Sequence, residues 1–126
     1  MFDHLTFDAK DLEASKKFYT EALAPLGIKL LVDLKEYQTA GFGVTRPEFW
    51  ISQGDPKTGS SGENIHISFK AKDRATVRAF YDAAIKAGAK DNGKPGLRPE
   101  YHEHFYGAFI LDLDGKNIEA CCRLPE

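Results

Sequence analysis

The sequence predicts an α+β fold in which one domain is built from two tandem βαβββ modules. Its 126 residues, 42% of them hydrophobic and 29% charged, are enough to bury one core without disulfides or structural metals. A segment near the N-terminus returns 62 positions later, and each copy combines strand-like alternation with helix-like spacing. We therefore place one domain at 1–126, with module one at 1–54, a linker at 55–63 and module two at 64–126.

The repeat runs without a gap through the opening of each module. Its matched blocks are His4–Phe7 with His66–Phe69, Ala9–Asp11 with Ala71–Asp73, and Phe18–Tyr19 with Phe80–Tyr81. One shared dipeptide can arise by chance, but here a single offset is kept through three blocks over about 20 residues. We interpret the whole chain as a duplicated module.

Each module is expected to begin with a strand and to continue into a helix. Residues 3–8 and 64–70 alternate apolar and polar side chains, which is the period of a strand with one buried face. Asp11 and Asp73 each precede apolar residues at helical spacing and suit the N-cap position, while Gly88 suits the end of the second helix.

Further strand-like segments follow each helix. They lie at 28–34, 37–44 and 48–52 in module one, and at 105–111 and 117–122 in module two. Asp114–Gly115 predicts a hairpin turn between the last two strands. The Gly- and Pro-rich segments 54–63 and 91–99 are predicted to be loops. Because the second loop interrupts a module, it is the candidate lid.

The charge balance and the cysteines narrow the function classes. Seventeen Lys and Arg against nineteen Asp and Glu give a net charge of −2, which does not favour a nucleic acid or an acidic membrane as partner. No apolar run approaches the ~20 residues that span a bilayer, and the first residues do not resemble a signal peptide. Cys121 and Cys122 are adjacent, a poor geometry for a disulfide, so free thiols in the cytoplasm are expected.

Alternation along the strands brings a candidate metal site to one face. If Leu5 and Phe7 face the helices, His4 lies on the opposite, concave face. The same reasoning places His66 and Glu119 on the concave face of their strands. Strand histidines are often held by hydrogen bonds alone. Their equivalent positions in the repeat, and the need of a buried carboxylate for a partner, favour a divalent Fe, Mn, Zn or Ni ion with open coordination positions.

Three stretches, together with the duplication, resemble the vicinal-oxygen-chelate superfamily. They are Asp3–Thr6, Lys17–Tyr19 and the closing stretch 111–120, which is similar to the family's Asp-Pro-Asp-Gly ending with Leu113 in place of Pro. This superfamily includes glyoxalase I, bleomycin resistance proteins, extradiol dioxygenases, methylmalonyl-CoA epimerase and fosfomycin-resistance transferases. The resemblance covers essentially the whole chain.

The resemblance implies an architecture and a ligand set. It implies that the two modules form one eight-stranded curved sheet, a cup with helices on its outer face. It implies that His4, His66 and Glu119 are the metal ligands, and that the protein is a homodimer, a state in which such sites are often shared between subunits.

One departure from the family pattern concerns the fourth strand. Glyoxalase I is expected to supply a fourth ligand there, a Glu, whereas this sequence has Trp50 at the matching concave position. An indole cannot replace a carboxylate ligand or base, so glyoxalase I chemistry is not expected. Trp50 instead suits stacking on a planar substrate, as in the metal-free binding proteins of the superfamily.

The segment before the seventh predicted strand offers further candidates. We expect Arg98 to bind an anionic group, and Tyr101, His102 or Tyr106 to move a proton during catalysis. Cys121 lies on the same strand face as Glu119 and is expected to line the substrate pocket. The alternative for these residues is a solvated loop and ordinary packing.

Two functions remain open from the sequence. The first is a metal-dependent enzyme of lyase, isomerase or dioxygenase type, acting on a small substrate that chelates the metal through oxygens. The second is a metal-free protein that binds or sequesters a small molecule, of the bleomycin-resistance type. One scaffold hosts several reactions, so the resemblance does not choose between reaction types.

Overall fold

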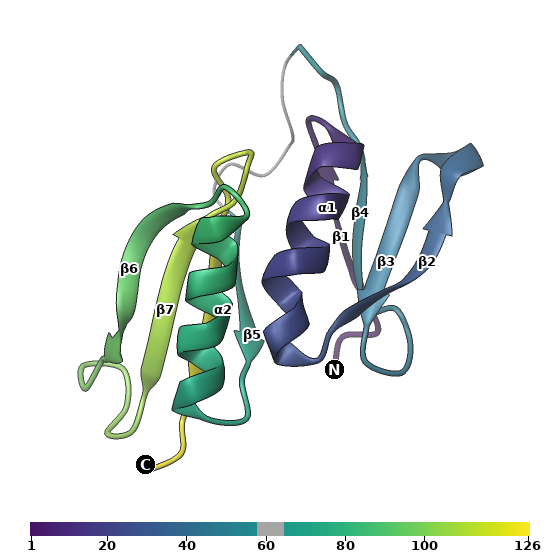
Figure 1. Ribbon diagram of the computed structural model, residues 1–126. Coiled ribbons are helices and arrows are strands. Elements are labelled where there is room, and N and C mark those ends of the chain that lie inside the picture. The colour runs from purple at the N-terminus through teal and green to yellow at the C-terminus, as the bar shows by residue number, and fades with distance from the viewer. Residues whose placement is uncertain (58–64) are drawn as a thin grey trace.

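The computed structural model describes residues 1–57 and 65–126, and it confirms the α+β class and the tandem βαβββ modules (Figure 1). Module one contains β1 (Leu5–Ala9), α1 (Leu12–Leu23), η1 (Ala24–Leu26), β2 (Lys29–Leu34), η2 (Lys35–Tyr37), β3 (Thr39–Gly43) and β4 (Phe49–Gln53). Module two contains β5 (His66–Lys70), α2 (Arg74–Lys86), β6 (Lys90–Leu97), β7 (Tyr106–Leu111) and β8 (Asn117–Cys122). Most of the predicted linker at 55–63 lies outside the described residues.

The strands of the described chain form two four-stranded sheets, one from each module. Their orders are β1-β4-β3-β2 and β5-β8-β7-β6, so each sheet repeats the topology of the other. The first strand of each module pairs in parallel with the last, and the remaining pairs are antiparallel. Helices α1 and α2 lie side by side and cover the same side of the two sheets, leaving the other side open (Figure 1).

Both helices begin as the sequence predicts and bury one apolar stripe. The Asp11 side chain accepts a hydrogen bond from the backbone N–H of Ala14 at 3.1 Å, and Asp73 accepts one from Thr76 at 2.7 Å. The buried core joins both modules, since Phe7 and Phe18 belong to the same cluster as Phe80. No helix in residues 1–57 and 65–126 is long and apolar enough to cross a membrane.

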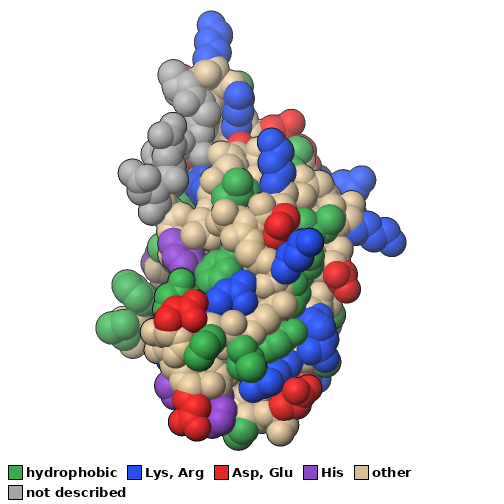
Figure 2. Space-filling view, turned by 90° about the vertical axis from the view of Figure 1, so that its left-hand side faces the viewer, with side chains coloured by type: hydrophobic (Ala, Val, Ile, Leu, Met, Phe, Trp, Pro, Cys, Tyr) green, Lys and Arg blue, Asp and Glu red, His purple; other side chains and the backbone are tan. Residues whose placement is uncertain are grey.

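The alternation predicted for the strands is observed. In β8 the helix-facing residues Ile118, Ala120 and Cys122 are buried, as Phe7 is in β1. Leu5, at the start of β1, remains 40% exposed. On the side of the molecule shown in Figure 2, basic side chains lie among acidic and hydrophobic ones instead of forming a continuous basic surface.

The loop predicted at 91–99 is wrong for most of its length, because β6 occupies 90–97. Glycine and proline predicted a turn, but this strand lies at the edge of its sheet, where a missing N–H is tolerated. The register against β7 shifts between Asp91 and Gly93 and again between Gly93 and Gly96, so the glycines accompany bulges. The segment is part of the sheet, and the lid expectation fails with it.

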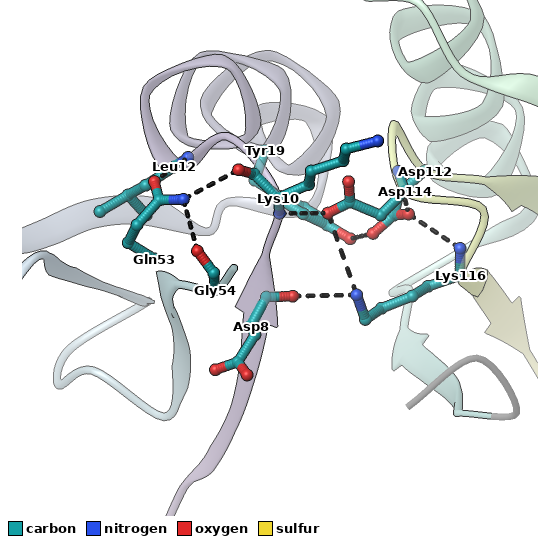
Figure 3. A network of polar contacts seen from close by, with 9 residues as sticks. All are labelled: Asp8, Lys10, Leu12, Tyr19, Gln53, Gly54, Asp112, Asp114 and Lys116. Atoms are coloured by element: carbon teal, nitrogen blue, oxygen red, sulfur yellow. Dashed lines mark hydrogen bonds and ion pairs between the residues drawn. The ribbon is translucent and has the colours of Figure 1, made fainter. Parts of the chain in front are cut away.

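A polar network ties the β7–β8 turn to module one (Figure 3). Asp112 Oδ1 accepts hydrogen bonds from the backbone N–H groups of Asp114 (2.9 Å) and Lys116 (2.8 Å), which shapes the turn. Asp112 Oδ2 accepts from the Tyr19 hydroxyl of α1 at 2.5 Å. The Lys116 ammonium, 1% exposed, donates to the Asp8 carbonyl at 2.9 Å. Tyr19, whose ring belongs to the shared core, therefore also links the two modules through its hydroxyl.

The Asp112 carboxyl predicts a pH dependence of stability. Burial raises its pKa, although hydrogen bonds from Tyr19, Lys116 and Asp114 act in the opposite direction. The folded state keeps this proton at a pH where the unfolded chain has lost it, so its contribution to the free energy of unfolding falls as the pH rises above about 4. Urea unfolding from pH 4 upward should show wild type losing stability relative to Asp112→Asn. A difference that does not change with pH would contradict this assignment.

Candidate metal and ligand site

The open face of the second sheet holds a buried carboxylate beside a histidine. His66 in β5 and Glu119 in β8 lie on adjacent parallel strands, and His66 Nε2 is 2.9 Å from Glu119 Oε1. Glu119 is only 4% exposed. Its second oxygen, Oε2, is buried and has no hydrogen-bond partner in the described part of the chain. One carboxylate oxygen is therefore left without a partner in a site that also contains an imidazole.

A glycine and an aromatic ring shape the space around this pair. A Cβ on Gly107 would lie 3.2 Å from Glu119 Oε2 and 2.9 Å from the Phe105 ring, so glycine leaves room for the carboxylate. The Phe109 ring lies beside the His66 imidazole, with centroids 5.9 Å apart. The Arg98 guanidinium lies over the same Phe109 ring at 5.5 Å, which brings Arg98 close to this pair.

The donor set fits a divalent first-row metal ion. A buried carboxylate oxygen without a partner is costly, and a bound cation would satisfy it. Imidazole nitrogen and carboxylate oxygen are ligands that Fe, Mn, Zn and Ni accept. His66 and Glu119 thus provide two of the three predicted ligands.

The third predicted ligand, His4, lies just before β1 and is oriented by its neighbour. Its Nδ1 is 2.7 Å from Asp3 Oδ1, and the imidazole is 55% exposed. The hydrogen bond with His4, followed by the charge of Arg46, lowers the pKa of Asp3. Donation from Nδ1 to this carboxylate leaves Nε2 with its lone pair, the form in which a histidine binds metal.

His4 lines a separate open cavity of about 600 Å³ on module one. Thr6 and Trp50, paired across β1 and β4, line the same cavity. The Trp50 indole N–H donates to the Pro47 carbonyl at 3.3 Å, and its ring crosses Gly41, where a Cβ would lie 3.0 Å away. Trp50 is therefore on the same face as His4, as the alternation predicts.

The candidate ligands lie in two separate half-sites, one with His4 on module one and the other with His66 and Glu119 on module two. No three His, Cys, Asp or Glu side chains within residues 1–57 and 65–126 lie close enough together to hold one metal ion. Glu119 lines a different cavity, of about 630 Å³, on module two. Among the described residues, His4 therefore does not lie with His66 and Glu119 in one site.

Comparison of the sequence with known protein families identifies the family of this chain. Residues 1–120 match the sequence profile of the Glyoxalase/Bleomycin resistance protein/Dioxygenase superfamily. The chain belongs to this superfamily. A search of curated proteins finds no significant match.

Solved structures of this superfamily share the fold over nearly the whole chain. A glyoxalase/bleomycin resistance protein from Albidiferax ferrireducens T118 is 28% identical, with a TM-score of 0.82 over 98% of this chain and 99% of that one. A family enzyme from Burkholderia phytofirmans PsJN is 17% identical, with a TM-score of 0.75 over 97% and 98%. The fosfomycin resistance protein FosX from Mesorhizobium loti is 20% identical, with a TM-score of 0.68 over 97% and 91%.

The remaining predicted site residues of this superfamily member fall in different places. Cys121 lines the cavity of Glu119, where the Ser68 hydroxyl donates to its sulfur at 3.3 Å and burial raises the pKa of the thiol. Tyr106 instead lies on the helix-covered face, where its hydroxyl accepts from Arg78 of α2 at 3.2 Å. Tyr106 therefore does not face Glu119 within the chain.

Tyr101 and His102 lie in the turn before β7. The Tyr101 ring packs edge-on against Phe105 at 5.3 Å, and Phe105 lines the same cavity as Glu119. His102 Nδ1 accepts a hydrogen bond from the backbone N–H of His104 at 3.1 Å. Both side chains are exposed. Tyr101 reaches the cavity wall through Phe105, whereas the His102 ring lies beside that of His104, with centroids 6.0 Å apart.

Sequence reasoning missed the basic residues of the second cavity. Lys70, Lys72 and Arg123 line it together with Phe105 and Glu119. The signal for Lys70 was present, since the alternation that selects His66 continues to residue 70 on the same face of β5. Lys72 and Arg123 lie beyond the strand ends, where alternation gives no guidance.

Proposed function

We propose that this protein is a divalent-metal-dependent enzyme of lyase, isomerase or dioxygenase type. Its substrate is a small molecule that chelates the metal through oxygens. The observation that carries the proposal is the buried Oε2 of Glu119, which has no hydrogen-bond partner among the described residues. The other oxygen of this carboxylate, Oε1, lies 2.9 Å from Nε2 of the His66 imidazole. Trp50, at the position where glyoxalase I is expected to have a Glu, argues against a glyoxalase I reaction.

The proposed assembly is a homodimer in which each metal site is shared. His4 and Glu119 line different cavities of one chain, and each half-site is open to solvent on the sheet face that no helix covers. A second copy that places its module one against module two of the first would supply the missing His4. Two identical sites then follow from the two-fold symmetry.

Each side chain has a proposed role in this site. His4, His66 and Glu119 would hold the metal, which would serve as a Lewis acid for a substrate oxygen. Trp50 stacks on a planar part of the substrate, and Phe109 excludes water beside His66. We propose Tyr101 or His102 as the group that moves a proton, because the Tyr101 ring packs on Phe105, which lines the cavity of Glu119, and His102 lies in the same turn.

Metal content tests this proposal. Wild-type protein is expected to carry one first-row metal per chain. His66→Ala should lose at least about 90% of it, because removing one of three ligands costs more metal affinity than removing a group that only orients a ligand. Mass spectrometry of purified, untagged protein measures the metal. His104→Ala, another partly exposed histidine on module two, is the matched control and should keep its metal.

Two outcomes would contradict the metal site. One is wild-type protein that stays empty after incubation with each of the four candidate metals. The other is an equal loss of metal from His66→Ala and His104→Ala. A protein empty in this way would favour the second function, a metal-free binding protein, for which the indole of Trp50 beside an open cavity of about 600 Å³ is the supporting observation.

A further inference from the structure

The second cavity has opposite chemistry at its two ends. Along β5 and β8, Glu119 lies near the middle of the strands, whereas Lys70 and Arg123 lie at or beyond their C-terminal ends. Lys72 follows shortly after β5 and lines the same cavity. The cavity of about 630 Å³ therefore runs from a buried carboxylate to a cluster of three cationic side chains.

Among the described residues the three cations have no close acidic contact, although, after the hydrogen bonds from Thr76, the charge of Lys72 contributes to lowering the pKa of its sequence neighbour Asp73. None of them takes part in an ion pair there, in contrast to Lys16, which contacts both Glu13 and Asp33. The Arg123 guanidinium instead stacks over the Phe105 ring at 5.1 Å, which orients it beside the cavity. Three positive charges that line one cavity repel each other, and a bound anion would offset this repulsion.

Part of the cavity wall is apolar, and the Ser68 hydroxyl and the Cys121 thiol line it as well. Phe105 is almost fully buried, and its ring lies in the cavity with Ala71 and Leu124. Such a wall suits a hydrocarbon body, while the charged ends fix its direction. The three cationic side chains attract an anionic group, so it is expected at that end of the cavity with the apolar body of the ligand against Phe105.

We propose that this cavity binds a small organic anion, with its carboxylate or phosphate among Lys70, Lys72 and Arg123 and its apolar body against Phe105. The inference names the substrate class for the proposed metal site, and it rests on that proposed function only in placing the other end of the ligand at Glu119. Carboxylate and phosphate ligands share the same chemistry here, because each presents anionic oxygens on an apolar body.

The test compares three probes of similar size on the protein as purified. Benzoate carries a carboxylate, phenyl phosphate carries a phosphate, and benzyl alcohol is neutral. Binding is followed by ¹⁵N NMR through the backbone amides of Ala71, Gly107 and Arg123. The triple variant Lys70→Gln/Lys72→Gln/Arg123→Gln should weaken binding of at least one anion about fivefold or more.

A charge-matched control separates the cavity from the overall charge. Lys17→Gln/Lys29→Gln/Lys90→Gln removes the same net charge at exposed positions outside the cavity, and it should change anion affinity less than about twofold. Selective loss for benzoate identifies a carboxylate, and selective loss for phenyl phosphate identifies a phosphate. Equal weakening in both triples, or benzyl alcohol binding as tightly as the anions, would overturn the inference.

A single-residue variant and the metal content of the triple variant address two remaining ambiguities, namely misfolding of the triple variant and failure of the proposed metal site. If the triple variant does not fold, Lys72→Glu alone, at an exposed position, should still weaken anion binding more than Lys17→Glu does. The metal content of the cavity triple separates the two proposals, since it should equal that of wild type. Charge-dependent anion binding by a protein that never binds metal would support this inference and overturn the proposed enzyme.

Discussion

Mixing His4→Ala protein with His66→Ala protein is expected to restore metal binding that neither variant has alone. The two histidines lie in half-sites that do not meet within the described chain. In a dimer that pairs module one of each copy with module two of the other, a mixed dimer contains one intact site and one site lacking both histidines. Random exchange makes half of the dimers mixed, so about one quarter of the wild-type metal content should return.

The matched control mixes His66→Ala with Glu119→Gln. Both substitutions lie in the same half-site, with the two side chains 2.9 Å apart, so every site in every dimer lacks one ligand. No metal should return in this mixture. Native mass spectrometry verifies that mixed dimers form in both cases. Mixed dimers without recovery in the first mixture would rule out a site shared in this way.

The face of the sheet on which each strand residue lies was predictable, because successive side chains along a strand point to opposite faces. That rule needs no tertiary information, and it placed Glu119 beside His66, on the face of β8 opposite to Ile118 and Ala120, which belong to the core. It says nothing about how one sheet lies relative to the other. The separation of His4 from Glu119 within the chain therefore required the structure, since both residues satisfy the same sequence pattern.

The segment at 91–99 shows where composition misleads. Glycine and proline favour turns. An edge strand, however, forms backbone hydrogen bonds with only one neighbouring strand, so it tolerates both residues at bulges. Gly93 has a φ of 147°, a conformation that favours glycine, so the residue that predicted a loop instead permits an irregular strand. Burial of Tyr19 was predictable from helical spacing, whereas its hydrogen bond to Asp112, 93 positions away, was not.

Replacing Asp112 with alanine is expected to lower the free energy of unfolding by about 3–4 kcal/mol. The substitution removes the acceptor for two backbone N–H groups of the β7–β8 turn and for the Tyr19 hydroxyl. The hydroxyl and the Lys116 N–H are buried, so each unpaired donor carries a desolvation cost. For a domain of this size the midpoint of thermal unfolding should fall by about 10–15 °C.

Tyr19→Phe separates the hydrogen bond from the rest of the network. It removes the hydroxyl together with its need for a partner, so it should cost only about 1–2 kcal/mol. Because both substitutions break the same contact, the double variant should be less destabilised than the sum of the two, and urea unfolding of all four proteins gives this coupling directly. Additive effects would contradict a direct Tyr19–Asp112 bond.

Asp112→Asn then distinguishes the turn from the link between modules. An amide oxygen at Oδ1 still accepts from the N–H groups of Asp114 and Lys116, which keeps the turn. The NH2 group that then replaces Oδ2 is a donor and cannot accept the hydrogen bond from the Tyr19 hydroxyl. Near pH 7 we expect Asp112→Asn to cost less than Asp112→Ala. Equal costs would mean that the contact between α1 and the β7–β8 turn, and not the turn itself, carries the stability of this network.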